Sequence, residues 1–159
     1  MHHQKICHTG NPVLDFSQIT PLIYAGNNMC CQDMFDKGLL KKGVKADISL
    51  EGERIDSPSG VDYFLWLPVK DHYPPTAKQI ILGGKFLDGL VKNKIKTYIH
   101  CKNGHTRTGT FLISYLIMKG WALKKAFDFI NKKRDCTHIT KIQMDFLKKF
   151  EKNYFRMLK

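Results

Sequence analysis

The sequence predicts an α/β fold, in which a central, mostly parallel sheet of four to five strands carries helices on both faces. Apolar segments of strand length alternate with segments of helical spacing through the middle of the chain, and helical segments then follow one another to its end. The 159 residues are 43% hydrophobic, which suffices for one substantial core. With no repeat or internal linker, residues 1–159 are expected to form a single domain.

The first half of the chain contains the less regular elements. Val44, Ala46, Ile48 and Leu50 alternate with other residues, as in a strand, whereas YFLWLPV is continuously apolar and predicts a strand buried on both faces. The predicted elements are an extended arm over 1–17, two short strands or a hairpin over 18–27, a helix over 29–43, and strands over 44–50 and 63–69. The helix is predicted because Met34, Phe35, Leu39 and Leu40 have helical spacing and Gly43 can serve as its C-cap.

The second half has clearer boundaries. Thr76 with Gln79, and Thr140 with Gln143, are capping-box pairs that begin helices. The segment from Arg107 to Lys119 is apolar on nearly all sides, as expected of a central helix, and Gly120 ends it. The remaining predicted elements are a helix from 76, a buried strand over 95–101, a helix over 121–133 and a last helix to about 157. The helix from 76 has Ile80, Gly84, Leu87 and Val91 on one face, and the helix over 121–133 is expected to bury Leu123, Ala126, Phe127 and Ile130.

Composition and charge narrow the possible partners and location of the protein and the expected state of its cysteines. The formal net charge of +12 favours phosphorylated or other anionic partners, although the lysines are spread along the chain as on solvated helix faces. No stretch approaches the ~20 apolar residues of a membrane span, and the N-terminus shows no secretion signal, so we expect a cytoplasmic protein. The five cysteines are odd in number and lack C-x-x-C spacing, which argues against a disulfide framework and a zinc site. We expect reduced thiols, no metal and no cofactor.

The stretch HCKNGHTRTG, residues 100–109, carries the chemistry. It joins a predicted buried strand to a predicted buried helix, and ligands of α/β sheets bind at the carboxyl ends of strands. The helix N-terminus offers unpaired N–H groups to an anion, and Gly104 lets the loop curl so that successive amides face inward. Arg107 can hold two phosphate oxygens, and Cys101 at the bottom of this cradle has its thiolate stabilised by the same positive field.

A second segment supplies a candidate acid. Asp71 follows the predicted strand over 63–69 in the sequence KDHYPPT, whose two prolines stiffen the loop. It can protonate the oxygen that departs from phosphorus and then activate water. Thr108 can donate a hydrogen bond to the Cys101 thiolate when sulfur is the leaving group. Asp62 and Asp88 are alternative acids, but one precedes a predicted strand and the other lies within a predicted helix.

HCKNGHTRTG resembles the H-C-x5-R-[S/T] signature of the cysteine-dependent protein tyrosine phosphatases. The ITPLIYAGN start, the upstream DHYPP and the short chain are similar to the compact atypical dual-specificity phosphatases, over roughly residues 18–155. The resemblance implies metal-free phosphomonoester hydrolysis through a cysteinyl-phosphate. Cys101 is then the nucleophile, Arg107 the phosphate clamp and Asp71 the general acid. Residues expected to bind phosphate are Lys102, Asn103, Gly104, His105, Thr106 and Arg107.

Alternative substrates remain open. Lys102 and His105 are basic where phosphoinositide phosphatases of this superfamily often carry basic residues, so a phosphoinositide or inositol phosphate is the alternative to a phosphotyrosine, phosphoserine or phosphothreonine protein. A phosphate-binding module without turnover is disfavoured by the complete set of site residues. An RNA 5′-triphosphatase is disfavoured by Asp71, because that group commonly lacks the acid, and no stable nucleic acid partner is expected.

We expect the chain to be a monomer.

The roles of several residues outside the phosphate loop also stay open. His100 is interpreted as a structural residue that shapes the loop, and Gln143 as a cap that could also orient water. Cys30, Cys31 and Cys136 are expected to be small core or loop residues, any of which could form a redox pair with Cys101.

Overall fold

The computed structural model describes residues 13–157. The elements are β1 (Phe16–Thr20), β2 (Ile23–Gly26), the 3-10 helix η1 (Asn28–Cys30), α1 (Lys37–Lys41), β3 (Val44–Glu51), β4 (Tyr63–Val69), α2 (Ala77–Lys92), β5 (Lys96–His100), α3 (Arg107–Met118), α4 (Leu123–Lys133) and α5 (Lys141–Met157). The predicted α/β class is confirmed.

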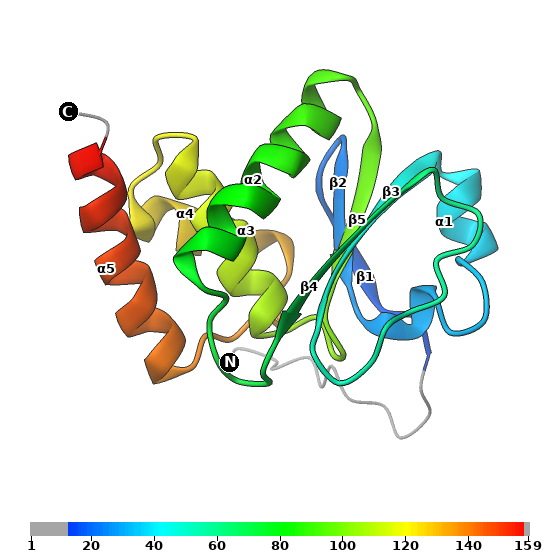
Figure 1. The fold of residues 1–159 in the computed structure, drawn as a ribbon, viewed down its shortest axis with the longest axis horizontal. Coiled ribbons are helices and arrows are strands. Elements are labelled where there is room, and N and C mark those ends of the chain that lie inside the picture. Colours follow the sequence, from blue (N-terminus) through cyan, green and yellow to red (C-terminus); the bar gives the residue numbers. More distant parts are fainter. Residues whose placement is uncertain (1–12, 158–159) are drawn as a thin grey trace.

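The strands form one sheet in the order β1-β2-β5-β3-β4. β1 pairs antiparallel with β2 in the expected hairpin, and the pairs β2–β5, β5–β3 and β3–β4 are parallel. The sheet is therefore mostly parallel, as predicted. The carboxyl ends of β3, β4 and β5 lie along one edge, where loops from distant parts of the sequence meet (Figure 1).

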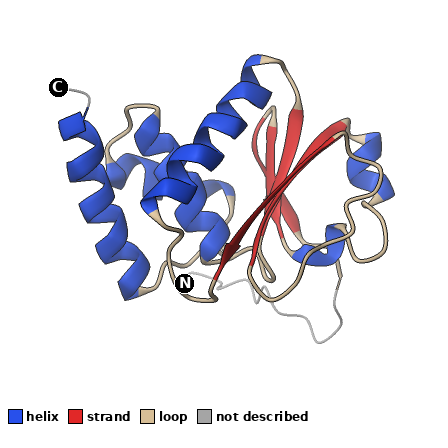
Figure 2. Cartoon of the chain, viewed as in Figure 1, coloured by secondary structure: helices blue, strands red, loops and turns tan. Residues whose placement is uncertain are grey.

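Helices cover the two faces of the sheet unequally. In Figures 1 and 2, α2, α3, α4 and α5 lie on one side of the sheet, and the short α1 lies on the other. The larger hydrophobic cluster includes Ile48 and Ile99 from the sheet with Phe111 and Leu147 from the helices. A smaller cluster packs on the α1 side and consists of the buried residues Tyr24, Cys30, Cys31, Phe35, Leu39, Val44 and Tyr98. Of the cysteines expected to be core or loop residues, Cys30 and Cys31 are core residues.

The predicted helix boundaries are largely confirmed. Thr76 and Gln79 form the complete capping box of α2. Gln143 and Thr140 exchange the two equivalent hydrogen bonds at the start of α5. α3 is buried along nearly its whole length, and Gly120 follows it with a φ of +89°.

Two predicted elements are wrong in detail. The helix expected over 29–43 is reduced to α1, because Asp36 caps the chain at that point by accepting a hydrogen bond from the Leu39 N–H. Met34, expected on its apolar face, is 50% exposed. β4 is not buried on both faces, because Tyr63 and Phe64 are exposed, and it is an edge strand paired only with β3.

The predicted N-terminal arm lies mostly outside the described residues, and its last two positions, 16 and 17, belong to β1. No helix within residues 13–157 has the length and apolar character needed to cross a membrane.

Candidate active site

The loop between β5 and α3 has the geometry of an anion cradle. Thr106 forms no side-chain hydrogen bond to cap α3, so the first N–H groups of this helix remain available to a ligand. The Gly104 N–H donates to Cys101 Sγ over 3.3 Å. Gly104 has a φ of +71°, and a Cβ there would overlap with the backbone of Gly26. The curled loop therefore requires glycine at this position.

Cys101 lies at the bottom of a pocket of about 100 Å³, and 2% of the residue is exposed. The pocket brings together most of the predicted site residues: it is lined by Asp71, His72, Cys101, Asn103, His105, Thr106, Arg107 and His138. Predicted residues from one loop and from the segment after β4 thus converge on the Cys101 sulfur.

Arg107 is almost completely buried and is held from three sides. Its Nη1 donates to Glu53 Oε2 over 2.8 Å and to the Val69 carbonyl over 2.9 Å, and its Nη2 lies 3.2 Å from Asp71 Oδ1. Burial would lower the pKa of Arg107, but the Glu53 hydrogen bond and the charge of Cys101 outweigh it and raise that pKa. The buried Nε–H has no acceptor among residues 13–157, and a phosphate oxygen would provide one.

Asp71 is placed by a tight turn after β4. The Tyr73 N–H donates to the Lys70 carbonyl, and His72 adopts a positive φ of 63°. The Asp71 side chain is 41% exposed and contacts both Arg107 and the His72 ring. Its carboxylate therefore lies at the mouth of the pocket, between solvent and the guanidinium.

The start of α5 holds the Asp71 loop. Thr140 Oγ1 donates to the His72 carbonyl over 2.9 Å, and Gln143 Nε2 donates to the Tyr73 carbonyl over 3.1 Å. Gln143 thus acts as a helix cap and as a tether of this loop.

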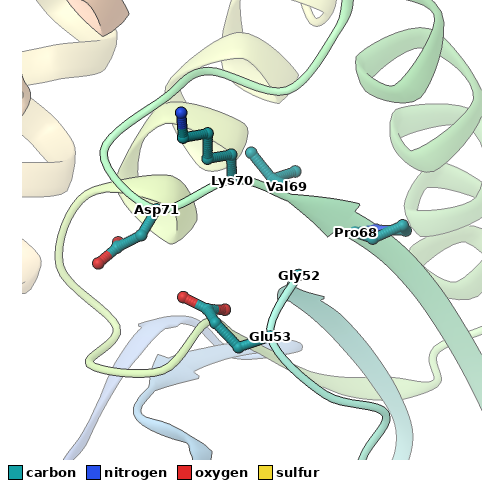
Figure 3. A pocket seen from close by; sticks show the side chains of 6 residues that line it. All are labelled: Gly52, Glu53, Pro68, Val69, Lys70 and Asp71. Atoms are coloured by element: carbon teal, nitrogen blue, oxygen red, sulfur yellow. The ribbon is translucent and has the colours of Figure 1, made fainter.

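Glu53 is a site residue that the sequence analysis missed. It follows β3, the third parallel strand whose end borders the site. Its position just after a predicted strand was the feature of the sequence that could have identified it. Burial would raise the pKa of Glu53, but the hydrogen bond from Arg107 outweighs this and lowers it. Glu53 and Asp71 both border a second pocket of about 470 Å³ beside the cradle, which Gly52, Pro68, Val69 and Lys70 complete (Figure 3).

Arg134 is a second missed residue, since the basic segments suggested solvated helix faces. It is 2% exposed, and its Nε donates to the Gly104 carbonyl over 2.9 Å. Its Nη2 donates to Asp15 Oδ2 over 2.7 Å, and its Nη1 to Ser17 Oγ over 3.2 Å. Burial opposes the charge of Arg134, but Asp15 outweighs it and raises the pKa. Arg134 therefore ties the phosphate loop to the β1 end of the sheet.

The remaining predicted residues occupy different environments. Lys102 is exposed, whereas His105 is buried and its ring centroid lies 5.3 Å from that of His138, another residue the sequence analysis missed. Thr108 is buried, but its hydroxyl has no hydrogen-bond partner within the described part of the chain, so the expected bond to the Cys101 thiolate is not formed here. Cys30, Cys31 and Cys101 are free thiols.

Comparisons with known proteins agree with this geometry. The family model described as "Polymorphic toxin system, DSP-PTPase phosphatase" matches residues 24–121. Protein-tyrosine-phosphatase IBR5 of Arabidopsis thaliana is 32% identical over 72 residues, which is 45% of this chain and 28% of that protein. The chain spans between 28% and 32% of the length of the curated relatives it matches first.

Two solved structures illustrate the shared fold. Human DUSP28 superposes with a TM-score of 0.79 at 17% identity, covering 89% of this chain and 99% of that one. PTPMT1 in complex with PI(5)P has a TM-score of 0.74 at 22% identity, covering 91% and 99%.

Proposed function

Because this chain belongs to the DSP-PTPase phosphatase family of polymorphic toxin systems, we propose that it hydrolyses phosphomonoesters of phosphotyrosine, and of phosphoserine or phosphothreonine, through a cysteinyl-phosphate. The resemblance seen in HCKNGHTRTG is confirmed by the family. The observation that carries the proposal is the position of Cys101 Sγ at the bottom of a pocket bordered by Arg107 and the uncapped start of α3.

The proposed reaction has two steps. The Cys101 thiolate attacks phosphorus, the bond to the leaving oxygen breaks, and protonated Asp71 gives its proton to that oxygen. Water then attacks phosphorus, Asp71 takes the water proton, the S–P bond breaks and inorganic phosphate leaves. Arg107 and the loop amides stabilise the phosphoryl oxygens in both steps. In the structure Asp71 contacts Arg107, so a bound phosphate takes over that contact and frees the carboxyl for the leaving group.

The first experiment is hydrolysis of para-nitrophenyl phosphate in the presence of EDTA. Cys101→Ser should reduce turnover to background, because a serine hydroxyl is not ionised at neutral pH. Cys136→Ser is the matched control: it removes a partly exposed thiol that does not line the Cys101 pocket, and it should retain activity. Equal activity of the parent and Cys101→Ser would contradict the mechanism.

A second experiment tests Asp71 as the acid. Asp71→Asn should slow hydrolysis of an alkyl phosphate, whose leaving oxygen needs a proton, more than hydrolysis of an activated aryl phosphate. If both substrates slowed equally, Asp71 would instead act by positioning Arg107, which it contacts at 3.2 Å.

A phosphoinositide or inositol phosphate is the second candidate substrate. It is supported by the shared fold of PTPMT1, whose structure contains PI(5)P, by His105 and His138, which line the pocket, and by the exposed Lys102 in the same loop as His105. Lys102→Ala combined with His105→Ala should then reduce turnover of an inositide far more than turnover of para-nitrophenyl phosphate. Equal losses on both substrates would contradict a role of these residues in binding additional phosphates.

A further inference from the structure

Two carbonyl groups of the phosphate loop accept hydrogen bonds from donors outside the loop. The Lys102 carbonyl accepts from the Asn28 backbone N–H over 3.1 Å, and the Gly104 carbonyl accepts from Arg134 Nε over 2.9 Å. The second contact is made by a side chain that lies 30 residues away in the sequence. The conformation of the loop at Gly104 therefore depends on the identity of a residue far outside the signature.

The contact between Arg134 and Gly104 fixes the direction of the next amide. A trans peptide group is planar, so its C=O and its N–H point to opposite sides of the chain. The carbonyl of the Gly104–His105 peptide points at Arg134, which does not line the Cys101 pocket, and the N–H of this peptide belongs to His105, which does. That N–H is thereby directed to the pocket side of the loop. The preceding N–H, that of Gly104, donates to Cys101 Sγ over 3.3 Å, so two successive amides face the cradle.

The guanidinium of Arg134 is itself held by the first strand of the sheet. Its Nη2 donates to Asp15 Oδ2 over 2.7 Å, just before β1, and its Nη1 donates to Ser17 Oγ within β1 over 3.2 Å. Because the guanidinium is planar, these two contacts fix the plane from which Nε reaches the Gly104 carbonyl. The positive charge of Arg134 also polarises the amide whose carbonyl it binds, which strengthens the N–H of that amide as a donor.

We propose that Arg134 is a positioning residue for phosphate binding, because it holds the Gly104–His105 amide so that the His105 N–H donates to an oxygen of the bound phosphoryl group. The proposal rests on the phosphate site described under the proposed function and adds to it a residue that does not touch the substrate. Backbone donors fixed in advance stabilise the charge that develops on oxygen during phosphoryl transfer. Without the guanidinium, nothing in its place would hold the Gly104 carbonyl outward, and the cradle would lose one fixed donor.

The test measures binding of tungstate, a tetrahedral dianion, to the full chain by isothermal titration calorimetry, alongside hydrolysis of para-nitrophenyl phosphate. Arg134→Met removes the guanidinium and keeps an unbranched side chain at this buried position. We expect tungstate affinity to fall at least about tenfold, and kcat/KM to fall about 10- to 100-fold, as for weakening of one oxyanion donor. Lys132→Met is the matched control, because it removes the same charge from an exposed position two residues away, and it should leave both quantities unchanged.

A conservative variant separates positioning from a purely structural role. Arg134→Lys keeps a charged donor for the Gly104 carbonyl but loses the planar fork, so its tungstate affinity should lie between those of the parent and Arg134→Met. Thermal melting shows which variants are folded at the assay temperature, and Arg134→Lys decides by the same criterion if Arg134→Met does not fold. Parental tungstate affinity in the folded variant, or no tungstate binding by the parent, would overturn the proposal. A parent chain that binds tungstate without hydrolysing para-nitrophenyl phosphate would contradict the proposed reaction, while the affinities would still test Arg134.

Discussion

At the scale of single residues, the phosphate pocket is organised around Arg107. Its guanidinium is held by two carboxylates and a carbonyl before any phosphate binds, so its orientation does not have to be established by the substrate. Glu53 is the closer of the two carboxylates and lies on a loop that the phosphate signature does not include.

We expect Glu53→Gln to lower kcat/KM for para-nitrophenyl phosphate about tenfold, because a neutral amide replaces one charge-assisted hydrogen bond to Arg107. Steady-state kinetics at neutral pH measure the effect, with the exposed Asp33→Asn as a control of equal charge change. An unchanged or increased kcat/KM would mean that the Glu53 carboxylate mainly repels the phosphate.

Two glycines with positive φ provide a matched comparison. Gly104→Ala places a Cβ against the backbone of Gly26, whereas Gly120→Ala meets nothing within 4 Å. We expect Gly120→Ala to cost about 1–2 kcal/mol of unfolding free energy from backbone strain alone, and to retain activity. Gly104→Ala should also abolish aryl phosphate hydrolysis, because the loop cannot keep its curl. Denaturant unfolding and activity assays separate the two effects, and similar activity of both variants would refute this role of Gly104.

At the scale of elements, three parallel strands deliver the site. Glu53 follows β3, Asp71 follows β4 and Cys101 follows β5, and α5 holds the Asp71 loop through Thr140 and Gln143. The positions of the helices on this side of the sheet therefore matter to the site.

An ion-pair network joins two of these helices: Asp88 on α2 contacts Lys119 after α3, at 2.6 Å, and Lys92 on its own helix, at 2.8 Å.

The α2–α3 contact should show a defined pH dependence. Hydrogen bonds from Lys119 and Lys92 lower the pKa of Asp88 to about 2. A carboxyl pKa that is lower in the folded chain stabilises it above the unfolded value of ~3.9, and this stabilisation is lost as pH falls toward 2. We expect Asp88→Asn to lower the unfolding free energy by about 0.5–1 kcal/mol at pH 7, and less in high salt, because the pair is partly exposed. Denaturant unfolding at pH 7 and pH 2 should show the difference disappearing, whereas an equal difference at both values would indicate packing instead.

At the scale of the whole molecule, one sheet separates two hydrophobic clusters. β5 contributes Ile99 to the larger cluster and Tyr98 to the smaller one, and β2 contributes Ile23 and Tyr24 in the same way. Loss of the sheet would expose both clusters at once, which favours cooperative unfolding of the chain as a single domain.

We expect calorimetry to show one transition, with an enthalpy of roughly 110 kcal/mol near 60 °C for a chain of this length. The calorimetric and van't Hoff enthalpies should agree. A separate early transition would contradict the single-domain prediction. If a separate early transition were present in the parent chain and absent from Leu39→Ala, the transition would report unfolding of the smaller cluster, because this substitution removes a buried side chain of α1.

The sequence predicted best those features whose causes are local. The capping boxes at Thr76 and Thr140 are short-range hydrogen-bond patterns, and the structure forms both. The burial of β4 could not be read in the same way. YFLWLPV has the composition of an interior strand, but its exposure depends on the order of strands in the sheet, in which it pairs with β3 alone.

The phosphate loop could be recognised from the sequence alone, because Cys101, Gly104 and Arg107 lie within one seven-residue segment at a strand–helix junction. The residues that surround this loop became evident only from the three-dimensional fold. Glu53 and Arg134 contact it from distant segments, since strand pairing and helix packing place them there. Such proximity is set by the free energy of burying the whole core, and a local pattern of residues does not encode it.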